Sequence, residues 1–127
     1  MIGIFDNVLK TSESDKLLSL CVSEDFPWLL NKELIQFPDY QQYEHYQLYH
    51  NLYDASFDKK IRSLYYPTFA PLIQSLTSVS KTTARLYRSK LNLLHNHYLS
   101  ETGSNPVHVD NREPHISMIY YINDSDG

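Results

Sequence analysis

The sequence predicts an α+β fold in which N-terminal helices pack on a mainly antiparallel sheet. Two observations lead to this class. Residues 1–80 contain stretches with apolar residues at helical spacing, whereas residues 81–127 contain β-prone stretches separated by a polar loop. A chain of 127 residues is short enough for a single domain. We therefore expect one domain, with 1–80 as an N-terminal support region and 81–127 as the first core strands.

The first 30 residues are predicted to form a strand, a helix and a second strand. Ile2, Ile4 and Val8 favour a short opening strand over residues 2–9. Candidate N-cap and acidic first-turn residues precede leucines at helical spacing, which predicts a helix from about Ser12 to Ser23. Residues 26–30 are apolar and follow this helix, so they are expected to form a short strand.

The middle of the chain is rich in tyrosine. Between Tyr40 and Tyr53 the tyrosines recur at spacings of three and four, so periodicity alone leaves helix and strand open. The high strand propensity of aromatic residues favours a strand. From Ser56 or Asp58 to Leu76 apolar residues follow one helical stripe, interrupted by two prolines. This interruption predicts two short helices rather than one straight helix.

The last third alternates between strands and a loop. Residues 82–94 alternate and predict a strand, residues 95–106 contain Gly and Asn-Pro and predict a loop, and residues 107–110 are expected to be extended. The stretch from His115 to Ile122 is strongly β-prone and predicts a further strand.

Composition excludes several function classes. The net charge of −4, with Lys and Arg scattered along the chain, argues against a nucleic-acid partner. No apolar run approaches the ~20 residues that span a membrane, and the first residues lack the features of a secretion signal. One cysteine permits no internal disulfide and fits a reducing compartment. We therefore expect a cytoplasmic protein without membrane or nucleic-acid partners; the oligomeric state stays open.

A His-x-Asp triplet, His108-Val109-Asp110, is the candidate metal site. Residues i and i+2 of an extended segment project to the same side, so an imidazole and a carboxylate converge on one point. Two imidazoles and one carboxylate on one face of an octahedron are the ligands of non-haem Fe(II) oxygenases. The triplet alone is a weak signal, because it is common by chance.

The surrounding sequence strengthens this interpretation. Residues 107–110, followed by Pro114-His-Ile-Ser-Met-Ile-Tyr-Tyr-Ile-Asn123, resemble the 2-oxoglutarate/Fe(II)-dependent oxygenase superfamily, and within it the prolyl-4-hydroxylase-like branch found in phages and marine bacteria. Residues 85–93 resemble the preceding core strand of that family, and the resemblance is specific over residues 82–127. It implies a sheet that is the first part of a double-stranded β-helix of the jelly-roll or cupin type.

The resemblance also implies roles for individual residues. His108 and Asp110 match the first two metal ligands, and Ser117 matches a hydroxyl that contacts the distal carboxylate of 2-oxoglutarate. Ser117 shares a strand face with Ile119 and Tyr121 and is expected to point inward. The remaining co-substrate candidates share one face of the upstream strand: Arg88, Lys90 and Asn92. The implied cofactors are Fe(II) and 2-oxoglutarate as co-substrate, with ascorbate as a candidate reductant, and the implied substrate is a peptide or small molecule.

The sequence departs from the family in one respect. The second metal His and the Arg or Lys that binds the co-substrate carboxylate follow a Gly-rich turn in the family, and the chain ends at Gly127 inside that turn. We therefore expect the domain to be C-terminally incomplete, with the metal triad incomplete in this chain. His115 is a poor substitute ligand, because its position in the strand does not direct it towards Asp110.

Other interpretations remain open. The chain is alternatively a non-catalytic binding or assembly module that keeps the fold without the metal centre, or a cupin that uses His95, His97 and His108. Ordinary structural roles are also open: a surface-loop histidine at 108, an Asx turn at Asp110, and a solvated strand edge for the basic residues. His45 and His50 are assigned no chemistry.

Overall fold

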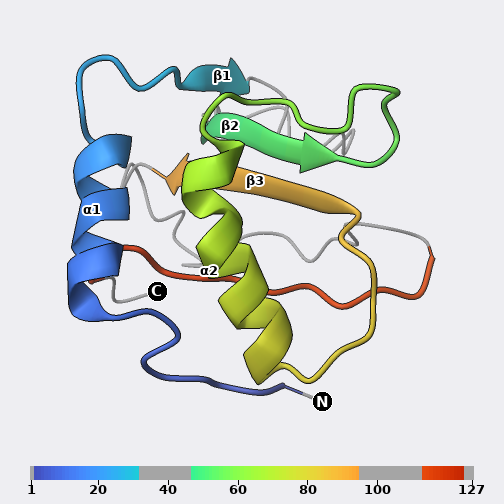
Figure 1. Cartoon of the computed structure of the whole chain (residues 1–127). Helices are drawn as coiled ribbons and strands as arrows, with labels where there is room; N and C mark the ends of the chain where they lie inside the picture. Colours follow the sequence, from blue (N-terminus) through green and yellow to red (C-terminus); the bar gives the residue numbers. More distant parts are fainter. Residues whose placement is uncertain (1, 32–46, 95–112, 125–127) are drawn as a thin grey trace, which may run out of the picture.

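The computed structural model describes residues 2–31, 47–94 and 113–124 (Figure 1). The order of elements is α1 (Thr11–Cys21), β1 (Leu29–Asn31), β2 (Gln47–Asp54), α2 (Tyr66–Val79) and β3 (Arg88–Leu94). The predicted α+β class is confirmed. In the described part of the chain, no helix is long and apolar enough to cross a membrane.

Helix α1 matches the predicted helix, with ends displaced by one or two residues. The Glu13 carboxylate accepts a hydrogen bond from the Lys10 backbone N–H at 3.2 Å, which satisfies a donor at the first turn. At the other end the Ser23 hydroxyl donates to the Leu20 carbonyl at 2.7 Å. The helix buries Leu17 and Cys21 against the rest of the protein.

The predicted opening strand over residues 2–9 is wrong. Ile2 and Ile4 are 93% and 87% exposed, so their side chains find no apolar partner. Asn7 adopts a left-handed backbone conformation with φ of 55°, which interrupts an extended chain. The segment therefore leads into α1 as irregular chain.

The sheet is antiparallel and has the order β1-β2-β3, so β2 is central. Leu29 faces Tyr49 across the first ladder, and His50 faces Leu91 across the second. The predicted strand at 26–30 is shorter and later, because turn hydrogen bonds from Phe26 and Trp28 to residues 23 and 26 precede it. The strand predicted over 40–53 is confirmed for 47–53, and residues 40–46 lie outside the described residues.

A β-bulge lies near the end of β2. The register shifts between Asn51 and Tyr53, so β2 holds one residue more than β3 over this stretch. Leu52 is 1% exposed in the core, and the neighbouring Tyr53 ring lies 5.7 Å from the ring of Tyr66 on α2. The bulge thus lets two consecutive residues reach the helical side, which strict alternation forbids.

The two helices predicted over residues 56–76 are replaced by one helix, α2. Asp54 accepts hydrogen bonds from the Ser56 N–H and hydroxyl, which forms a tight turn where a helix was expected. The chain then pairs with the end of β2, since Asp54 N–H donates to the Lys60 carbonyl and Arg62 N–H to the Leu52 carbonyl, both at 2.9 Å. Helix α2 starts at Tyr66, where Pro67 lies in the first turn and removes no helical hydrogen bond.

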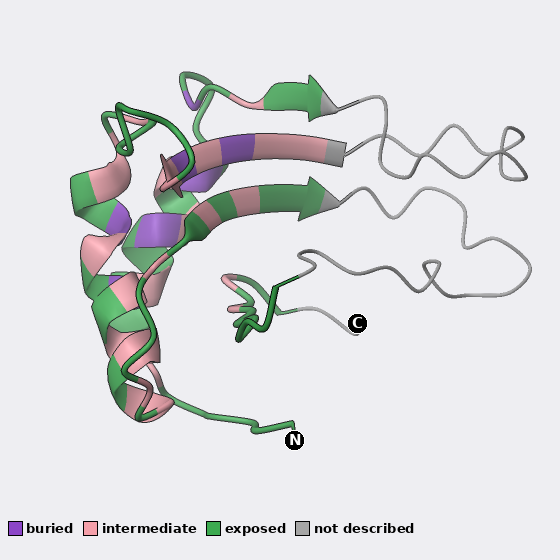
Figure 2. Cartoon of the chain, turned by 90° about the vertical axis from the view of Figure 1, so that its right-hand side faces the viewer, coloured by how far each residue is buried: buried purple, intermediate pink, exposed green. Residues whose placement is uncertain are grey.

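Both helices pack on the same side of the sheet (Figure 2). The core contains six buried apolar residues from α1, the turn before β1, β2 and α2: Leu17, Cys21, Phe26, Leu52, Phe69 and Leu72. Leu91 of β3 packs against this cluster. The strand predicted over 82–94 is confirmed only for β3, and residues 82–87 approach it as irregular chain.

The strand predicted at His115–Ile122 is wrong in the described structure. Residues 113–124 run beyond β3, on the side away from β2 (Figures 1 and 2), and pair with no strand there. Side chains along this segment still alternate between a buried and an exposed side, since Tyr120 and Ile122 pack against the core while Ile119 is 75% exposed. The Tyr120 hydroxyl lies 3.0 Å from the Ser14 hydroxyl of α1. Side-chain packing on the helical layer, rather than a backbone ladder, therefore holds this segment.

Candidate functional site

The two predicted metal ligands, His108 and Asp110, lie outside the described residues, as do His95 and His97. The structure therefore does not bear on their geometry. It does place the other five predicted site residues, which belong to β3 and to the segment 113–124. Within the described ranges, no group of three or more His, Cys, Asp or Glu side chains is arranged to hold a metal ion.

Arg88, Lys90 and Asn92 project from one face of β3. Leu91, which alternates with them, packs against the core under the helices. The three polar side chains therefore lie on the sheet face that is turned away from α1 and α2, and all three are exposed. This face carries the predicted co-substrate residues together on one side of the strand.

Arg88 and Lys90 have different neighbours. Arg88 pairs across the ladder with Asp54, whereas Lys90 pairs with Asn51. Hydrogen bonds from Ser56 lower the pKa of the Asp54 carboxyl, and the charges of Arg88 and Arg62 lower it further. Asp54 is therefore ionised at neutral pH and competes with any free carboxylate for Arg88. Lys90 has no such competitor opposite it.

Ser117 and Tyr121 do not face the helical core. Ser117 is exposed, and Tyr121 is 64% exposed. Tyr120 and Ile122, which alternate with them, pack against the core. Ser117 therefore shares with Ile119 and Tyr121 the side of the segment that is turned away from the helices.

Sequence reasoning missed a buried histidine. His50 on β2 is 8% exposed, and its Nδ1 lies 2.9 Å from the Pro27 carbonyl oxygen. A carbonyl only accepts, so Nδ1 carries the proton and donates it. In the neutral ring Nε2 then accepts from the Ser63 hydroxyl at 2.6 Å, and the Tyr65 N–H donates to the same hydroxyl oxygen at 3.0 Å. The signal in the sequence is a histidine alternating with Leu48 and Leu52.

The His50–Ser63 pair has the distance of a nucleophile and its base, but its setting is structural. The imidazole packs beside Phe26 at 4.8 Å and Tyr65 at 5.9 Å between ring centroids. Neither His50 nor Ser63 lines either of the two pockets described below. The pair ties the turn before β1, the centre of β2 and the start of α2 to one another.

Replacement of His50 should therefore destabilise the fold. We expect His50→Phe to lower the free energy of unfolding by about 1–3 kcal/mol, because the Pro27 carbonyl and Ser63 hydroxyl lose their partner in a buried place. The measurement is urea unfolding followed by circular dichroism. His115→Phe is the matched control: His115 also contacts a backbone carbonyl, at 2.8 Å, but is exposed. An equal loss in both variants contradicts the structural role of His50.

Cys21 has the properties of a core thiol rather than of a nucleophile. Burial raises the pKa of the Cys21 thiol from 9.0 to about 11. The folded state then keeps a proton that the unfolded state loses. The stability contributed by this group is therefore fully present below about pH 9 and is lost as the pH rises towards about 11.

The matching measurement is urea unfolding at about pH 7.5 and about pH 10.5 for the native sequence and Cys21→Ala. We expect the native sequence to lose more stability than the variant over this interval. The comparison with Cys21→Ala removes the effects of tyrosines and lysines, which titrate in the same range in both proteins. Identical pH dependence in the two proteins contradicts the raised pKa.

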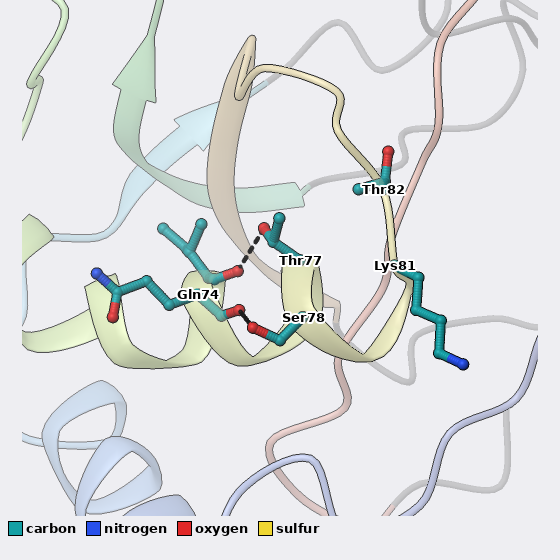
Figure 3. A pocket seen from close by; sticks show the side chains of 6 residues that line it. Gln74, Thr77, Ser78, Lys81 and Thr82 are labelled. Carbon is teal, nitrogen blue, oxygen red and sulfur yellow. Dashed lines mark hydrogen bonds between the residues drawn. The ribbon is translucent and has the colours of Figure 1, made fainter.

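One pocket, of about 590 Å³, lies at the end of α2 and the turn after it (Figure 3). Two of the hydroxyls that line it are engaged as donors: Thr77 donates to the Ile73 carbonyl at 2.8 Å and Ser78 to the Gln74 carbonyl at 2.9 Å. Lys81 extends away from Gln74 in this view.

A second pocket, of about 560 Å³, lies where β2 ends, α2 begins and the chain enters β3. It combines tyrosines with Lys60 and Arg85 and has no acidic lining residue.

Comparison with protein-family models, with curated proteins and with solved structures found no match.

Proposed function

We propose that this chain is a 2-oxoglutarate- and Fe(II)-dependent dioxygenase that hydroxylates a prolyl or other peptidyl side chain. One observation carries the proposal: the triplet His108-Val109-Asp110, followed by the apolar residues 115–122, resembles the metal-binding region of that superfamily. The donor types fit, since an imidazole and a carboxylate two positions apart supply part of the facial set that Fe(II) takes.

The described residues support the proposal through their arrangement. In the sequence, the stretch that holds the triplet follows β3 and precedes the segment 113–124. This segment runs beyond β3, at the edge of the sheet away from β2 (Figure 1). Helices cover one sheet face, and the other face presents the polar side chains of β3. A double-stranded β-helix needs such a face for its pocket, and we propose that this sheet is its first part.

The neighbours of the two cations on β3 refine the proposed roles. His108 and Asp110 would hold Fe(II), which, with bound 2-oxoglutarate and oxygen, supplies the oxidation of an unactivated C–H bond. Lys90, opposite Asn51, would bind a co-substrate carboxylate, because Arg88 is already opposite the ionised Asp54. Asn92 would add an amide donor from the same face. Ser117 and Tyr121 lie on the side of their segment that is turned away from the helical core, and they would add hydroxyls from there.

The test of this function is succinate formation from 2-oxoglutarate. Protein with Fe(II), ascorbate and proline-containing peptides is assayed for succinate by chromatography and for hydroxylated peptide by mass spectrometry. We expect succinate that depends on added Fe(II) and that is lost in Asp110→Ala. In Lys90→Gln we expect a raised KM for 2-oxoglutarate, whereas Arg88→Gln should leave it within about twofold. Succinate formation that persists in Asp110→Ala contradicts the proposal.

The second candidate is a non-catalytic binding or assembly module derived from the same fold. A folded protein that forms no succinate and takes up no metal, with or without 2-oxoglutarate, would support it over the enzyme.

A further inference from the structure

The second pocket joins three separate parts of the chain. Tyr53 comes from the end of β2, Tyr66 from the first turn of α2, and Tyr87 from the residue before β3. The Ala55 N–H donates to the Tyr87 carbonyl at 2.8 Å, which fixes the strand ends relative to each other. The pocket is therefore built on hydrogen-bonded backbone. Its volume of about 560 Å³ lies in the range of small-molecule sites.

The charge of this pocket differs from that of the whole chain. The chain has a net charge of −4, yet Lys60 and Arg85 line the pocket and no acidic residue does. Within residues 2–31, 47–94 and 113–124, neither cation has a carboxylate partner in an ion pair. Asp54, next to the pocket residues Tyr53 and Ala55, is bonded to Ser56 and influenced by Arg88 and Arg62. Two cationic side chains thus line one pocket and can both donate hydrogen bonds to an anion.

Aromatic rings supply the other half of the pocket. The ring centroids of Tyr53 and Tyr66 lie 5.7 Å apart and the ring planes are tilted by 32°, so the two rings pack against each other. The Tyr87 side chain is 50% exposed although it lines the pocket, which leaves much of its ring accessible. A ring face with adjacent cations is the combination that binds a base and its phosphate in nucleotide-binding proteins.

We propose that this pocket binds a nucleoside monophosphate, with the base against a tyrosine ring and the phosphate between Lys60 and Arg85. Lys60 and Arg85 supply ammonium and guanidinium donors to the phosphate oxygens. None of the residues that line this pocket is a predicted metal ligand or co-substrate residue. The proposed nucleotide site can therefore be tested independently of the dioxygenase proposal.

The test is isothermal titration of the whole protein with AMP, adenosine and inorganic phosphate as three separate probes. We expect AMP to bind at least about tenfold more tightly than either fragment, because only AMP uses both the rings and the cations. Lys60→Gln and Arg85→Gln should each weaken AMP binding by about tenfold or more. Lys81→Gln is the matched control, since Lys81 is an exposed cation that lines the other pocket; it should bind AMP as the native sequence does.

Three outcomes would overturn the site. They are no AMP binding at millimolar concentration, equal binding of AMP and either fragment, or unchanged binding in both Lys60→Gln and Arg85→Gln. Because both positions are exposed, these substitutions are expected to leave the fold intact, which circular dichroism checks. A further arm repeats the AMP titration in 2-oxoglutarate. If 2-oxoglutarate displaces AMP and binds as tightly as AMP does, the result would contradict a nucleotide site.

Discussion

Phe69→Ala should remove a large part of the stability of this fold. Phe69 on α2 is completely buried and lies in the core with Leu52, Leu72 and the buried residues of α1. Truncating such a phenylalanine costs about 3–5 kcal/mol, because apolar contact is lost and a cavity remains. Small domains have only about 5–15 kcal/mol in total. We therefore expect a large fall in the urea midpoint, measured by circular dichroism.

Leu64→Ala is the matched control for this experiment. Leu64 lies just before α2 and is 97% exposed, so its truncation removes almost no buried surface. The free energy of unfolding should change by no more than about 0.5 kcal/mol. If Leu64→Ala destabilises the protein as much as Phe69→Ala does, the described core is not the core in solution.

His108→Ala should have the largest effect on the proposed activity. If His108 is one of the metal ligands, its loss removes one of the two protein ligands that the resemblance assigns to this chain. Substitutions of groups that merely support a ligand cost about 10–100-fold, so loss of the ligand itself should lower succinate formation by about 100-fold or more. The measurement is the initial rate of succinate formation at saturating Fe(II). His115→Ala should retain the native rate, because His115 is not a predicted ligand.

The fold class followed from the sequence because local periodicity reports which face of an element is buried. The leucine pattern located α1, and the aromatic run located β2. The helix expected to begin at Ser56 or Asp58 was wrong for a local reason: Ser56 donates its N–H and its hydroxyl to the Asp54 carboxylate and so forms a turn instead of a helix start. The bulge at Leu52 likewise leaves no periodic signal, since it depends on how β2 meets α2.

The candidate site was predictable only in part. Alternation along β3 placed Arg88, Lys90 and Asn92 on one face from the sequence alone. The same alternation groups Ser117 with Ile119 and Tyr121, but it does not tell which of its two faces a segment buries when both contain apolar residues. The contact of His50 with Ser63 joins residues 13 positions apart in sequence. It depends on tertiary packing, as does the pocket lined by Lys60 and Arg85.

His108 and Asp110 are proposed to form a metal site that also uses 2-oxoglutarate. The most direct test of this site is calorimetric titration of Mn(II), a substitute for Fe(II) that is stable in air, with and without 2-oxoglutarate. We expect saturable Mn(II) binding that 2-oxoglutarate tightens by about tenfold or more, with both effects lost in His108→Ala and retained in His115→Ala. Binding of Mn(II) that is the same in His108→Ala, or that ignores 2-oxoglutarate, would contradict it.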